Sequence, residues 1–445
     1  MNVPRLMIAA QSSGSGKTTV TCGILQALVN RGLKVSSFKC GPDYIDPMFH
    51  KEVIGADSTN IDPYFCDDDL LKYLFTRNAD GSDIAVIEGV MGFYDGSLLD
   101  SSKDSSCDIS LKLDTPVVLI VDSSGSSYSN VAVLKGFVEL ERNNIKGVIF
   151  NRMSEKVFGS IRHHVEDMGI IPIGYIPKMK DIKLESRHLG LVMPEEISDI
   201  KEMLNEIAKR FESTLDIDAM IGLAKTTTEI EFKTPPMPEN RYDVRIAVAD
   251  DEAFCFMYHD NLCLLESMGA KIVRFSPIHD DVMPEADALI LYGGYPENNA
   301  KALSDNRTMI DSIRKNISKG MPCLAECGGF MYLHERMEGS DGEMYDMCDI
   351  IKGDTKRTQG LVRFGYVELS SPKFDGVIRA HEFHHWDSDN NGEDWIATDV
   401  KGNSYRCIHD DGRIVAGFPH MYYYSNPAFI DSFLKRASEY RKCGC

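Results

Sequence analysis

The sequence contains no long hydrophobic run. None of its apolar stretches reaches the roughly 18 residues that a membrane-spanning helix needs, so we expect no membrane partner. The first apolar stretch, residues 6–10, leads directly into a polar loop rich in glycine, which differs from the pattern of a cleaved secretory signal. Together these absences predict a cytoplasmic protein.

The 12 cysteines are scattered, and none of them forms a C-x-x-C pair. This absence argues against a zinc ribbon, whose ligands come in such pairs. We expect reduced thiols, most of them buried as small apolar side chains, as is usual in the cytoplasm. Cys443 and Cys445 at the end of the chain could bind a metal, but a frayed terminus is the simpler interpretation.

An excess of basic residues is also missing: 48 Lys and Arg stand against 68 Asp and Glu, which gives a formal net charge of −20. Because the backbone of a nucleic acid is itself negative, this balance argues against a nucleic-acid partner. The chain has no internal repeat and no low-complexity segment. Its 445 residues exceed the usual length of one domain and predict two or three.

Strand candidates alternate with helical stretches through the first half of the chain. They are short and continuously apolar, which is typical of a parallel sheet covered on both faces. They occupy residues 6–10, 35–38, 84–87, 117–121, 147–150 and 171–175. Apolar side chains at helical spacing between residues 197 and 211 predict an amphipathic helix that closes this half.

A segment rich in proline and threonine, residues 225–240, interrupts the pattern. It predicts a linker between one domain at 1–224 and another at 241–445. Beyond it, strand candidates return at residues 245–249, 271–275, 288–291 and 322–325, with helices expected between the first three and before the fourth. We therefore predict the α/β fold class, with two α/β domains.

The loop after the first strand has the composition of a phosphate-binding loop. Residues 11–19 read QSSGSGKTT, with Gln11 in place of the usual first glycine, and a helical pattern follows. The backbone N–H groups of such a loop bind phosphate, its lysine neutralises the charge, and its threonine hydroxyl can hold Mg²⁺. The predicted ATP-binding residues are Gly14, Ser15, Gly16, Lys17, Thr18 and Thr19.

Carboxylates follow the next two strand candidates. Asp43 and Asp46 come after the second, and Glu88 and Asp95 come after the third. Ligands of such sheets bind at the carboxyl ends of the strands. A carboxylate after an apolar strand is the expected partner of the loop threonine for Mg²⁺, which here pairs Glu88 with Thr18. Taken alone, Asp43 or Asp95 would be read as a turn or helix-capping residue.

A polar pair, Asn151 and Arg152, follows the strand candidate at 147–150. Its place at the same sheet edge is compatible with a contact to the nucleotide base. An ordinary polar pair at a strand end is an equally good interpretation.

In the second half, residues 324–333 read LAECGGFMYL: a strand, a cysteine, two glycines and a helix. A cysteine at such a turn lies at a sheet edge and at a helix N-terminus, which favours the thiolate, so Cys327 is the predicted nucleophile. Gly294 is predicted to supply an oxyanion-hole donor, and His420 is the predicted base. A buried, inert thiol is the alternative for Cys327 and the expected state of Cys323.

Three other histidines, His381, His384 and His385, form a cluster. Two histidines three residues apart can share a helix face, as in some metal sites. No cysteine or acidic ligand set accompanies them at a familiar zinc spacing, so contacts with a substrate or at an interface are the favoured interpretation.

Taken together, these motifs resemble the cobyrinic acid a,c-diamide synthase family, which includes the Ni-sirohydrochlorin a,c-diamide synthases. The resemblance covers nearly the whole chain. It is carried by SGSGKTT at 13–19, GPDYIDP at 41–47, EGVMG at 88–92, YDG at 94–96, RHLGL at 187–191, GGYPE at 293–297, AECGG at 325–329 and HEFH at 381–384.

The resemblance implies a P-loop domain like dethiobiotin synthetase, followed by a class I glutaminase domain of flavodoxin-like fold. The family uses ATP and Mg²⁺ to amidate the a and c acetate groups of a tetrapyrrole, with ammonia from L-glutamine. It implies that Lys17 and Thr18 hold the phosphates and Mg²⁺, while Cys327 attacks glutamine with His420 as base. In class I amidotransferases an orienting glutamate lies two residues after the base; here Tyr422 holds that place.

The implied reaction passes through an acyl phosphate, because a carboxylate attacked directly by ammonia would have to expel oxide. The resemblance implies Asp43 as a further Mg²⁺ ligand, and Asp46 and Asp95 as part of a substrate and acyl-phosphate site. We expect the ammonia to reach the acyl phosphate without meeting bulk water, where it would be protonated. Cobyrinate is the expected substrate and Ni-sirohydrochlorin the alternative. A switch ATPase of the partitioning type shares the phosphate loop and is the rival from another class. A homodimer is the assembly that related folds suggest.

Overall fold

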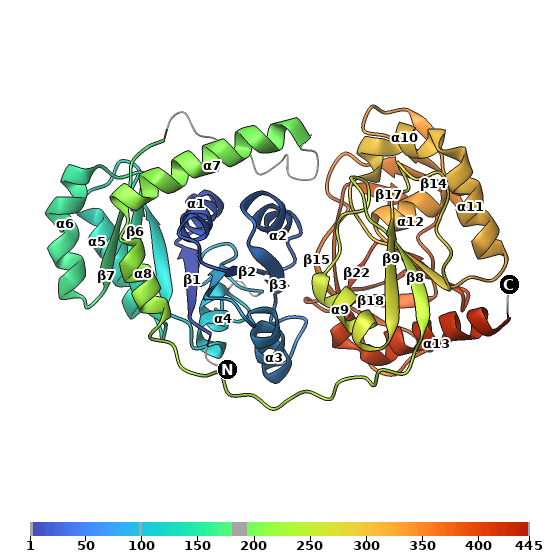
Figure 1. Ribbon diagram of the computed structural model, residues 1–445, viewed down its shortest axis with the longest axis horizontal. Helices are drawn as coiled ribbons and strands as arrows, with labels where there is room; N and C mark the ends of the chain where they lie inside the picture. The colour runs from blue at the N-terminus through green and yellow to red at the C-terminus, as the bar shows by residue number, and fades with distance from the viewer. Residues whose placement is uncertain (1–2, 98–99, 180–193, 444–445) are drawn as a thin grey trace. The chain divides into compact units, whose positions relative to one another are not determined.

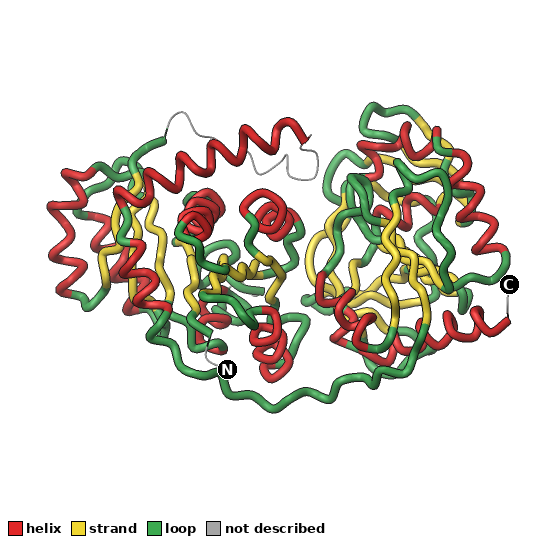
Figure 2. The backbone as a smooth tube through the Cα atoms, in the orientation of Figure 1, coloured by secondary structure: helices red, strands yellow, loops and turns green. Residues whose placement is uncertain are grey.

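The computed structural model describes residues 3–97, 100–179 and 194–443 (Figure 1). The chain divides into two compact units, Met1–Pro235 and Pro236–Cys445. The division lies inside the segment expected to be a linker, residues 225–240, which forms neither helix nor strand. Each unit combines helices with its own strands, as Figure 2 shows.

Unit 1 is built on a seven-stranded parallel sheet in the order β3-β2-β4-β1-β5-β6-β7. Its strands are β1 (Arg5–Ala10), β2 (Val35–Cys40), β3 (Asp57–Ile61), β4 (Ile84–Glu88), β5 (Val117–Asp122), β6 (Ile145–Asn151) and β7 (Ile171–Ile176). The six strand predictions are confirmed. The edge strand β3 escaped prediction because its sequence, DSTNI, is mostly polar.

The helices of unit 1 cover both faces of this sheet. They are α1 (Lys17–Asn30), α2 (Ile45–Phe49), the π-helix η1 (His50–Ile54), α3 (Asp68–Asn78), α4 (Ser106–Lys112), α5 (Ser129–Glu139), α6 (Glu155–Asp167), α7 (Pro194–Thr214) and α8 (Ile217–Ala224). On one face, Leu6 and Ile8 of β1 join the core formed with α1, α7 and α8. On the other, the ring of Phe38 lies 4.6 Å from that of Phe75 in α3.

Helix α7 packs closely on α1 (Figure 1). A Cβ added to Gly23 of α1 would lie 2.3 Å from the Phe211 ring, so glycine is what allows the two helices to approach. Leu204, Ile207 and Phe211 are buried on this side of α7. The predicted amphipathic helix is therefore confirmed.

Unit 2 has a six-stranded main sheet in the order β20-β21-β11-β10-β8-β9, parallel except for the short edge strand β20. The strands are β8 (Val244–Ala249), β9 (Ala270–Phe275), β10 (Ala288–Leu291), β11 (Cys323–Glu326), β20 (His409–Asp410) and β21 (Ile414–Gly417). Its helices are α9 (His259–Ser267), the 3₁₀ helix η2 (Pro296–Asn299), α10 (Ala300–Asp305), α11 (Arg307–Ser318), α12 (Gly328–Leu333), the 3₁₀ helix η3 (Tyr423–Ser425) and α13 (Pro427–Cys443).

One expected helix is absent: residues 276–287, between β9 and β10, form turns. The Asp280 carboxylate accepts a hydrogen bond from the Ser276 N–H over 2.7 Å, and Asn306 donates to the carbonyl of Asp280 over 2.8 Å. Side chains that bond the local backbone in this way compete with helix formation, and Pro277 and Pro284 reinforce the effect. The prediction of a helix here was wrong.

Two further sheets in unit 2 were not anticipated. A four-stranded sheet, β13-β12-β14-β17, is mixed, and a five-stranded sheet, β19-β18-β15-β16-β22, is antiparallel. Their strands are β12 (His334–Glu338), β13 (Met344–Asp346), β14 (Ile351–Arg357), β15 (Arg363–Ser370), β16 (Ile378–His384), β17 (Trp386–Ser388), β18 (Trp395–Asp399), β19 (Ser404–Cys407) and β22 (His420–Met421). The last of these carries the predicted base.

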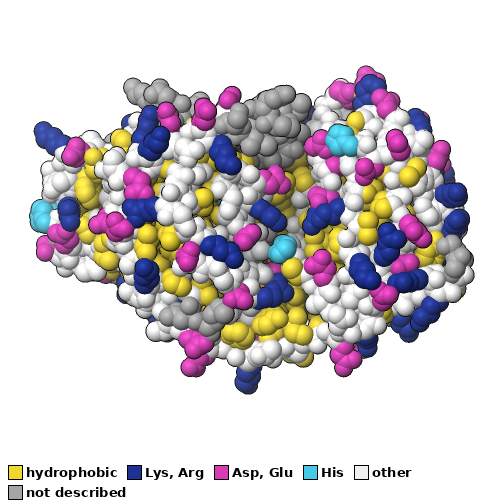
Figure 3. Space-filling view, viewed as in Figure 1, with side chains coloured by type: hydrophobic (Ala, Val, Ile, Leu, Met, Phe, Trp, Pro, Cys, Tyr) yellow, Lys and Arg dark blue, Asp and Glu magenta, His cyan; other side chains and the backbone are white. Residues whose placement is uncertain are grey.

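On the face drawn in Figure 3, acidic and basic side chains are intermixed on both units. No helix among the described residues is long and apolar enough to cross a membrane. None of the described cysteines forms a disulfide bond, and most of them are buried.

Candidate active sites

The phosphate loop lies between β1 and α1 in unit 1. Gly14 and Gly16 have φ values of 77° and 87°, a left-handed conformation that favours glycine. Gly16 is the N-terminal cap of α1, so the first free N–H groups of that helix open toward the loop. The hydroxyls of Ser12 and Ser15 are 3.1 Å apart across it. The replacement of the first glycine by Gln11 leaves this conformation intact.

Two polar residues at the end of β6, Asn151 and Arg152, bond to the backbone of the phosphate loop. The Asn151 amide donates to the Ser15 carbonyl over 2.8 Å, and Arg152 donates to the Gly14 carbonyl over 3.3 Å. Arg152 is also paired with Asp122 over 2.6 Å. The structure therefore shows Asn151 and Arg152 in contact with the backbone of the phosphate loop.

The Lys17 ammonium group donates to the Met91 carbonyl over 2.6 Å. Met91 belongs to the loop after β4 and has a φ of 45°, an unusual conformation for a residue with a side chain. Burial and repulsion by the nearby Lys39 lower the pKa of Lys17 to about 8. A bound triphosphate would raise this pKa again, because it would bring negative charge to the same ammonium group.

Glu88, at the end of β4, is the centre of the site. Its carboxylate accepts a hydrogen bond from the Thr18 hydroxyl over 3.0 Å. The same carboxylate oxygen lies 2.9 Å from the ammonium group of Lys39. Lys39 also forms an ion pair with Asp46 and lies 3.8 Å from the Asp43 carboxylate.

Burial and charge act in opposite directions on these groups. Burial alone would raise the pKa of Glu88, but Lys39 and His50 hold it below the ordinary value. The pKa of Lys39 is raised in turn, because its three carboxylate neighbours outweigh the effect of burial. Burial and the charge of Glu88 raise the pKa of Asp46 to about 6. The site thus keeps a lysine and a glutamate charged in the interior.

Sequence reasoning assigned no role to Lys39 or His50. The Nε2 atom of His50 lies 3.4 Å from Glu88, and its Nδ1 lies 2.8 Å from the Ser37 hydroxyl. The available signal for Lys39 was its position: a lysine at the end of a buried strand, next to the glycine and aspartate of the following motif. His50 carried no such signal, because it belongs to the helical segment after that motif.

The three aspartates predicted at this sheet edge make different contacts. One oxygen of Asp43 accepts from the N–H of Ile45 over 2.9 Å at the start of α2. Asp95 accepts from the N–H of Gly92 over 3.0 Å and closes a turn. Asp46 is buried against Lys39. Asp43 and Asp46 therefore join Glu88 around Lys39, whereas Asp95 bonds to the backbone of its own loop.

The residues at this edge fit a magnesium ion. Magnesium prefers oxygen ligands, and it is usually held by one or two carboxylates together with phosphate oxygens rather than by a cage of protein ligands. Thr18 and Glu88 offer a hydroxyl and a carboxylate within 3.0 Å of each other. The second oxygen of Glu88 is buried and faces Nε2 of His50 at 3.4 Å. No cluster of three or more His, Cys, Asp or Glu within the described chain forms a metal cage.

Cys327 in unit 2 stands at a sharp turn between β11 and α12. Its backbone has φ 47° and ψ −106°, a strained combination for a residue with a side chain. The turn is held by its N–H, which donates to the Gly417 carbonyl of β21 over 2.8 Å. Behind it, a Cβ on Gly329 would lie 2.2 Å from the Leu291 carbonyl, so the close packing of α12 on β10 requires glycine.

Three segments that follow β10, β11 and β21 meet beside this turn. A Cβ on Gly293 would lie 2.3 Å from the Cε1 atom of His420, and one on Gly328 would lie 3.2 Å from the N atom of Gly294. Gly294 itself is closely packed, since a Cβ there would lie 2.1 Å from the Ala253 carbonyl. The structure therefore brings the predicted nucleophile segment, oxyanion turn and base to one edge of the main sheet.

The resting protonation states differ from one expectation. We expected the turn to favour a thiolate, but burial, together with the charge of Glu297, raises the pKa of Cys327 above its ordinary value. Burial, with His381 and His384 nearby, lowers the pKa of His420 well below its ordinary value. The resting pair is a neutral thiol and a neutral imidazole. A neutral imidazole can accept the thiol proton when a substrate is attacked.

His381 and His384 lie on strand β16 and His385 directly follows it, so these histidines share no helix face. His381 and His384 are buried, and His385 is exposed. His384 donates from Nδ1 to the Trp386 carbonyl over 2.7 Å, and its ring stacks on Phe418 with 3.9 Å between centroids. Two other sequence features, the RHLGL motif at 187–191 and the terminal Cys445, lie outside the described residues.

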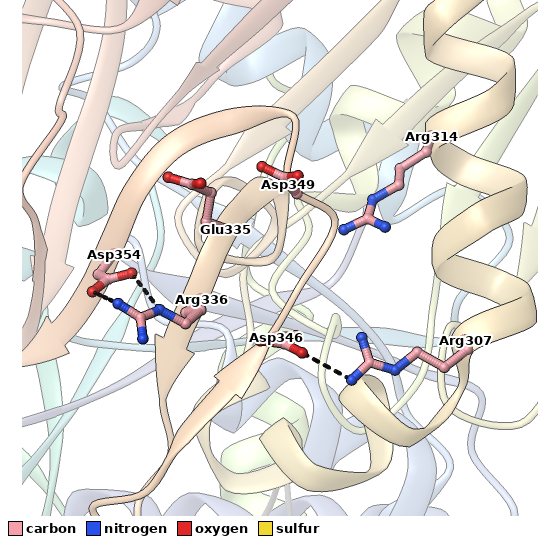
Figure 4. A pocket seen from close by; sticks show the side chains of 7 residues that line it. All are labelled: Arg307, Arg314, Glu335, Arg336, Asp346, Asp349 and Asp354. Atoms are coloured by element: carbon pink, nitrogen blue, oxygen red, sulfur yellow. Dashed lines mark hydrogen bonds and ion pairs between the residues drawn. The ribbon is translucent and has the colours of Figure 1, made fainter.

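A charged recess of about 460 Å³ lies elsewhere in unit 2 (Figure 4). It is lined by Arg307, Arg314, Glu335, Arg336, Asp346, Asp349 and Asp354. These charges largely satisfy one another: Arg336 pairs with Asp354 over 2.8 Å and Arg307 with Asp346 over 3.1 Å. Since none of them belongs to the segments around Cys327, we do not connect the recess with that site.

The phosphate loop with Glu88 and the cysteine elbow with His420 define a class of enzyme: a ligase that binds a nucleotide and hydrolyses glutamine. Comparison with known families agrees. Residues 6–192 match the CobQ/CobB/MinD/ParA nucleotide binding domain, and residues 245–428 match the CobB/CobQ-like glutamine amidotransferase domain. The two matched regions contain the two sites.

Full-length relatives identify the family. The chain is 38% identical to the cobyrinate a,c-diamide synthase of Listeria innocua, covering 96% of this chain and 98% of the relative. It is 38% identical to that of Fusobacterium nucleatum (96% and 98%) and 39% identical to that of Salmonella typhimurium (97% and 97%). The chain belongs to the cobyrinate a,c-diamide synthase family. Among solved structures, a glutamine amidotransferase aligns over 43% of this chain with a TM-score of 0.31 and 17% identity, which adds nothing to the assignment.

Proposed function

We propose that this protein amidates the a and c acetate groups of cobyrinate, with ATP as the activating substrate and glutamine as the source of ammonia. The observation that carries the proposal is the presence of two complete constellations in one chain. Lys17, Thr18 and Glu88 lie together at the phosphate loop of unit 1. Cys327 and His420 lie at one sheet edge in unit 2. The named relatives support cobyrinate as the substrate.

In unit 1 the task is to turn a carboxylate into an electrophile. Transfer of the γ-phosphoryl group to a substrate carboxylate gives an acyl phosphate, which ammonia can attack because phosphate is a good leaving group. Carboxylate and triphosphate repel each other, and the ammonium group of Lys17 reduces that repulsion. Thr18, Glu88 and Asp43 would hold Mg²⁺, which supplies further positive charge beside the phosphates when it is bound. Asp46 and Asp95 are proposed for the carboxylate side of the site.

In unit 2 the task is to release ammonia from glutamine. The Cys327 sulfur attacks the amide carbon as its proton moves to His420, and the same proton then passes to the departing nitrogen, which leaves as ammonia. The N–H group of Gly294 is proposed to stabilise the oxyanion of the tetrahedral intermediate. Water then hydrolyses the thioester, with His420 again accepting a proton.

The choice of tetrapyrrole is the part of the proposal that the site chemistry leaves open, since Ni-sirohydrochlorin carries acetate groups that the same chemistry would amidate. The amidotransferase domain opposes a switch ATPase of the partitioning type, which needs no glutaminase half. A cytoplasmic homodimer without a nucleic-acid partner stays a prediction, to be checked by light scattering during size-exclusion chromatography.

The decisive assay combines the purified protein, MgATP, glutamine and either cobyrinate or Ni-sirohydrochlorin. Mass spectrometry should detect two successive amidations of cobyrinate, with ADP formed in step. Cys327→Ala should lose glutamine-supported amidation by about 1,000-fold or more but keep ammonium-supported amidation. Cys443→Ala, a change at an exposed cysteine, should behave as the parent protein. Faster amidation of Ni-sirohydrochlorin would overturn the substrate, and no ATP-dependent amidation of either would overturn the function.

A further inference from the structure

In class I amidotransferases the residue two positions after the base is a glutamate that orients it. In this chain that residue is a tyrosine, Tyr422, and it bonds to another side chain. Tyr422, two residues after His420, donates its hydroxyl to the Asp260 carboxylate over 2.8 Å. Both side chains are buried. The Asp260 carboxylate is thus hydrogen-bonded to Tyr422. A different residue packs directly against the imidazole of His420.

That residue is His381. Strands β16 and β22 are antiparallel, and their register places His381 opposite His420. The two rings are stacked, with centroids 5.0 Å apart and planes inclined by 22°. His381 is 6% exposed and His420 is 2% exposed, so the stacked pair is closed off from solvent. A stacked partner in a buried site restricts rotation of the imidazole about its side-chain bonds.

His381 is itself held by a third residue. The Tyr258 hydroxyl lies 3.1 Å from Nδ1 of His381 in the interior. The Tyr258 ring also packs edge-on against Tyr422, with 5.3 Å between centroids and an angle of 79°. Tyr258 occupies the N-cap position of α9. Tyr258, at the start of α9, thus contacts His381, and His381 stacks on the base. Helix α9 is separate from the segment that carries the nucleophile.

We propose that His381, held by Tyr258, is the positioning residue of the base His420. The inference rests on the proposed function, because it concerns the glutaminase step of that reaction. During attack His420 gains the proton of the Cys327 thiol and becomes an imidazolium ion. The stacked ring of His381 holds the orientation of His420 while the imidazole takes up that proton and passes it on. His381 exchanges no proton in this scheme.

Three variants test the proposal in the full-length protein. His381→Ala should lower the glutaminase kcat about 100-fold with little change in the KM for glutamine, because a base that has lost its orientation fails after binding. His381→Phe keeps the stacked ring and should recover kcat to within about fivefold of the parent. Tyr258→Phe removes only the hydroxyl and should cause an intermediate loss. His385→Ala, an exposed neighbour in the same motif, is the matched control and should be unchanged.

Each variant is also assayed for ammonium-supported amidation, which does not use the glutaminase half and should stay at the parental rate. A His381→Ala kcat within twofold of the parent would overturn the inference, and so would a His381→Phe variant as slow as His381→Ala. If His381→Ala does not fold, an unaffected kcat in Tyr258→Phe overturns it instead. A parent protein with no glutaminase activity at all refutes the proposed function, a result separate from any difference among the variants.

Discussion

The ammonium group of Lys39 lies 2.9 Å from the carboxylate of Glu88, and both groups are buried. They meet because β2 and β4 run parallel with a register that places residue 39 beside residue 88. A single buried charge would be strongly unfavourable, so each of the two is retained in the interior by the other. The pair also places a lysine beside the proposed phosphate and carboxylate site.

The Lys39–Glu88 pair leads to a prediction for stability. Lys39→Met should destabilise unit 1 by about 3–5 kcal/mol, because it leaves buried carboxylates without their counter-ion. The double variant Lys39→Met with Glu88→Gln should lose less. Lys146→Met, at an exposed lysine of β6, is the matched control and should be neutral. Hydrogen exchange of β4 amides under increasing urea measures these differences. Equal losses in the single and double variants would contradict the pairing.

ATP binding should weaken at alkaline pH. The pKa of Lys17 is lowered to about 8 by burial and by Lys39, so the charged form of the free enzyme declines above that pH. The Kd for ATP should be constant below pH 8 and should rise by up to about tenfold per pH unit above it. Calorimetric titration between pH 7 and 9.5 measures this. Lys17→Arg keeps its charge and should show a flat profile. A flat profile in the parent protein would contradict the prediction.

A methyl group at Gly293 should damage the glutaminase alone. In Gly293→Ala the new Cβ would meet His420 at 2.3 Å, so the imidazole would have to move. We expect a loss of about 100-fold in glutamine hydrolysis, with ammonium-supported amidation retained. Gly360→Ala is the matched control in the same unit, since nothing lies within 4 Å of its added Cβ. Normal glutamine hydrolysis by Gly293→Ala would place the base elsewhere.

Glu326, directly before the nucleophile, should make stability depend on pH. Burial raises its pKa to about 8 in the folded protein, although the Tyr423 hydroxyl donates to it over 3.2 Å. An unfolded chain releases the proton near pH 4.5. The folded state therefore binds the extra proton between these values, and stability falls as the pH rises from about 4.5 to 8.

The variant Glu326→Gln cannot ionise and should escape this loss. Its stability relative to the parent should improve by about 2–4 kcal/mol between pH 5 and pH 8. Urea midpoints of unit 2 at the two pH values give the comparison. An unchanged difference between the proteins at pH 5 and pH 8 would show that Glu326 ionises normally in the fold.

The sheet of unit 1 could be largely predicted because its central strands are continuous apolar runs. A strand such as β5 can be predicted from its own residues, because burial on both faces selects apolar residues along its whole length. β3 and the strands of the two smaller sheets of unit 2 were missed for the opposite reason. A strand such as β15 alternates between buried and exposed residues, and its pairing with distant strands defines it more than its composition does.

The expected helix after β9 failed on a similar ground. Its two prolines already oppose a helix, and the hydrogen bonds of Asp280 and Asn306 hold the segment in turns. The histidines of β16 illustrate the same limit. Three-residue spacing suggested a helix face, but pairing with β15 and β22 makes the segment a strand.

The sequence by itself was enough to single out the residues proposed to carry the chemistry. Lys17, Thr18, Glu88 and Cys327 each belong to a local motif, in which a strand end or a glycine turn imposes the needed conformation on a few neighbouring residues. The tertiary structure alone decided which charges and rings meet: Lys39 with Glu88, and His381 with His420. Those meetings depend on the register between strands that are far apart in the chain, and register is set by the packing of the whole sheet rather than by any local pattern.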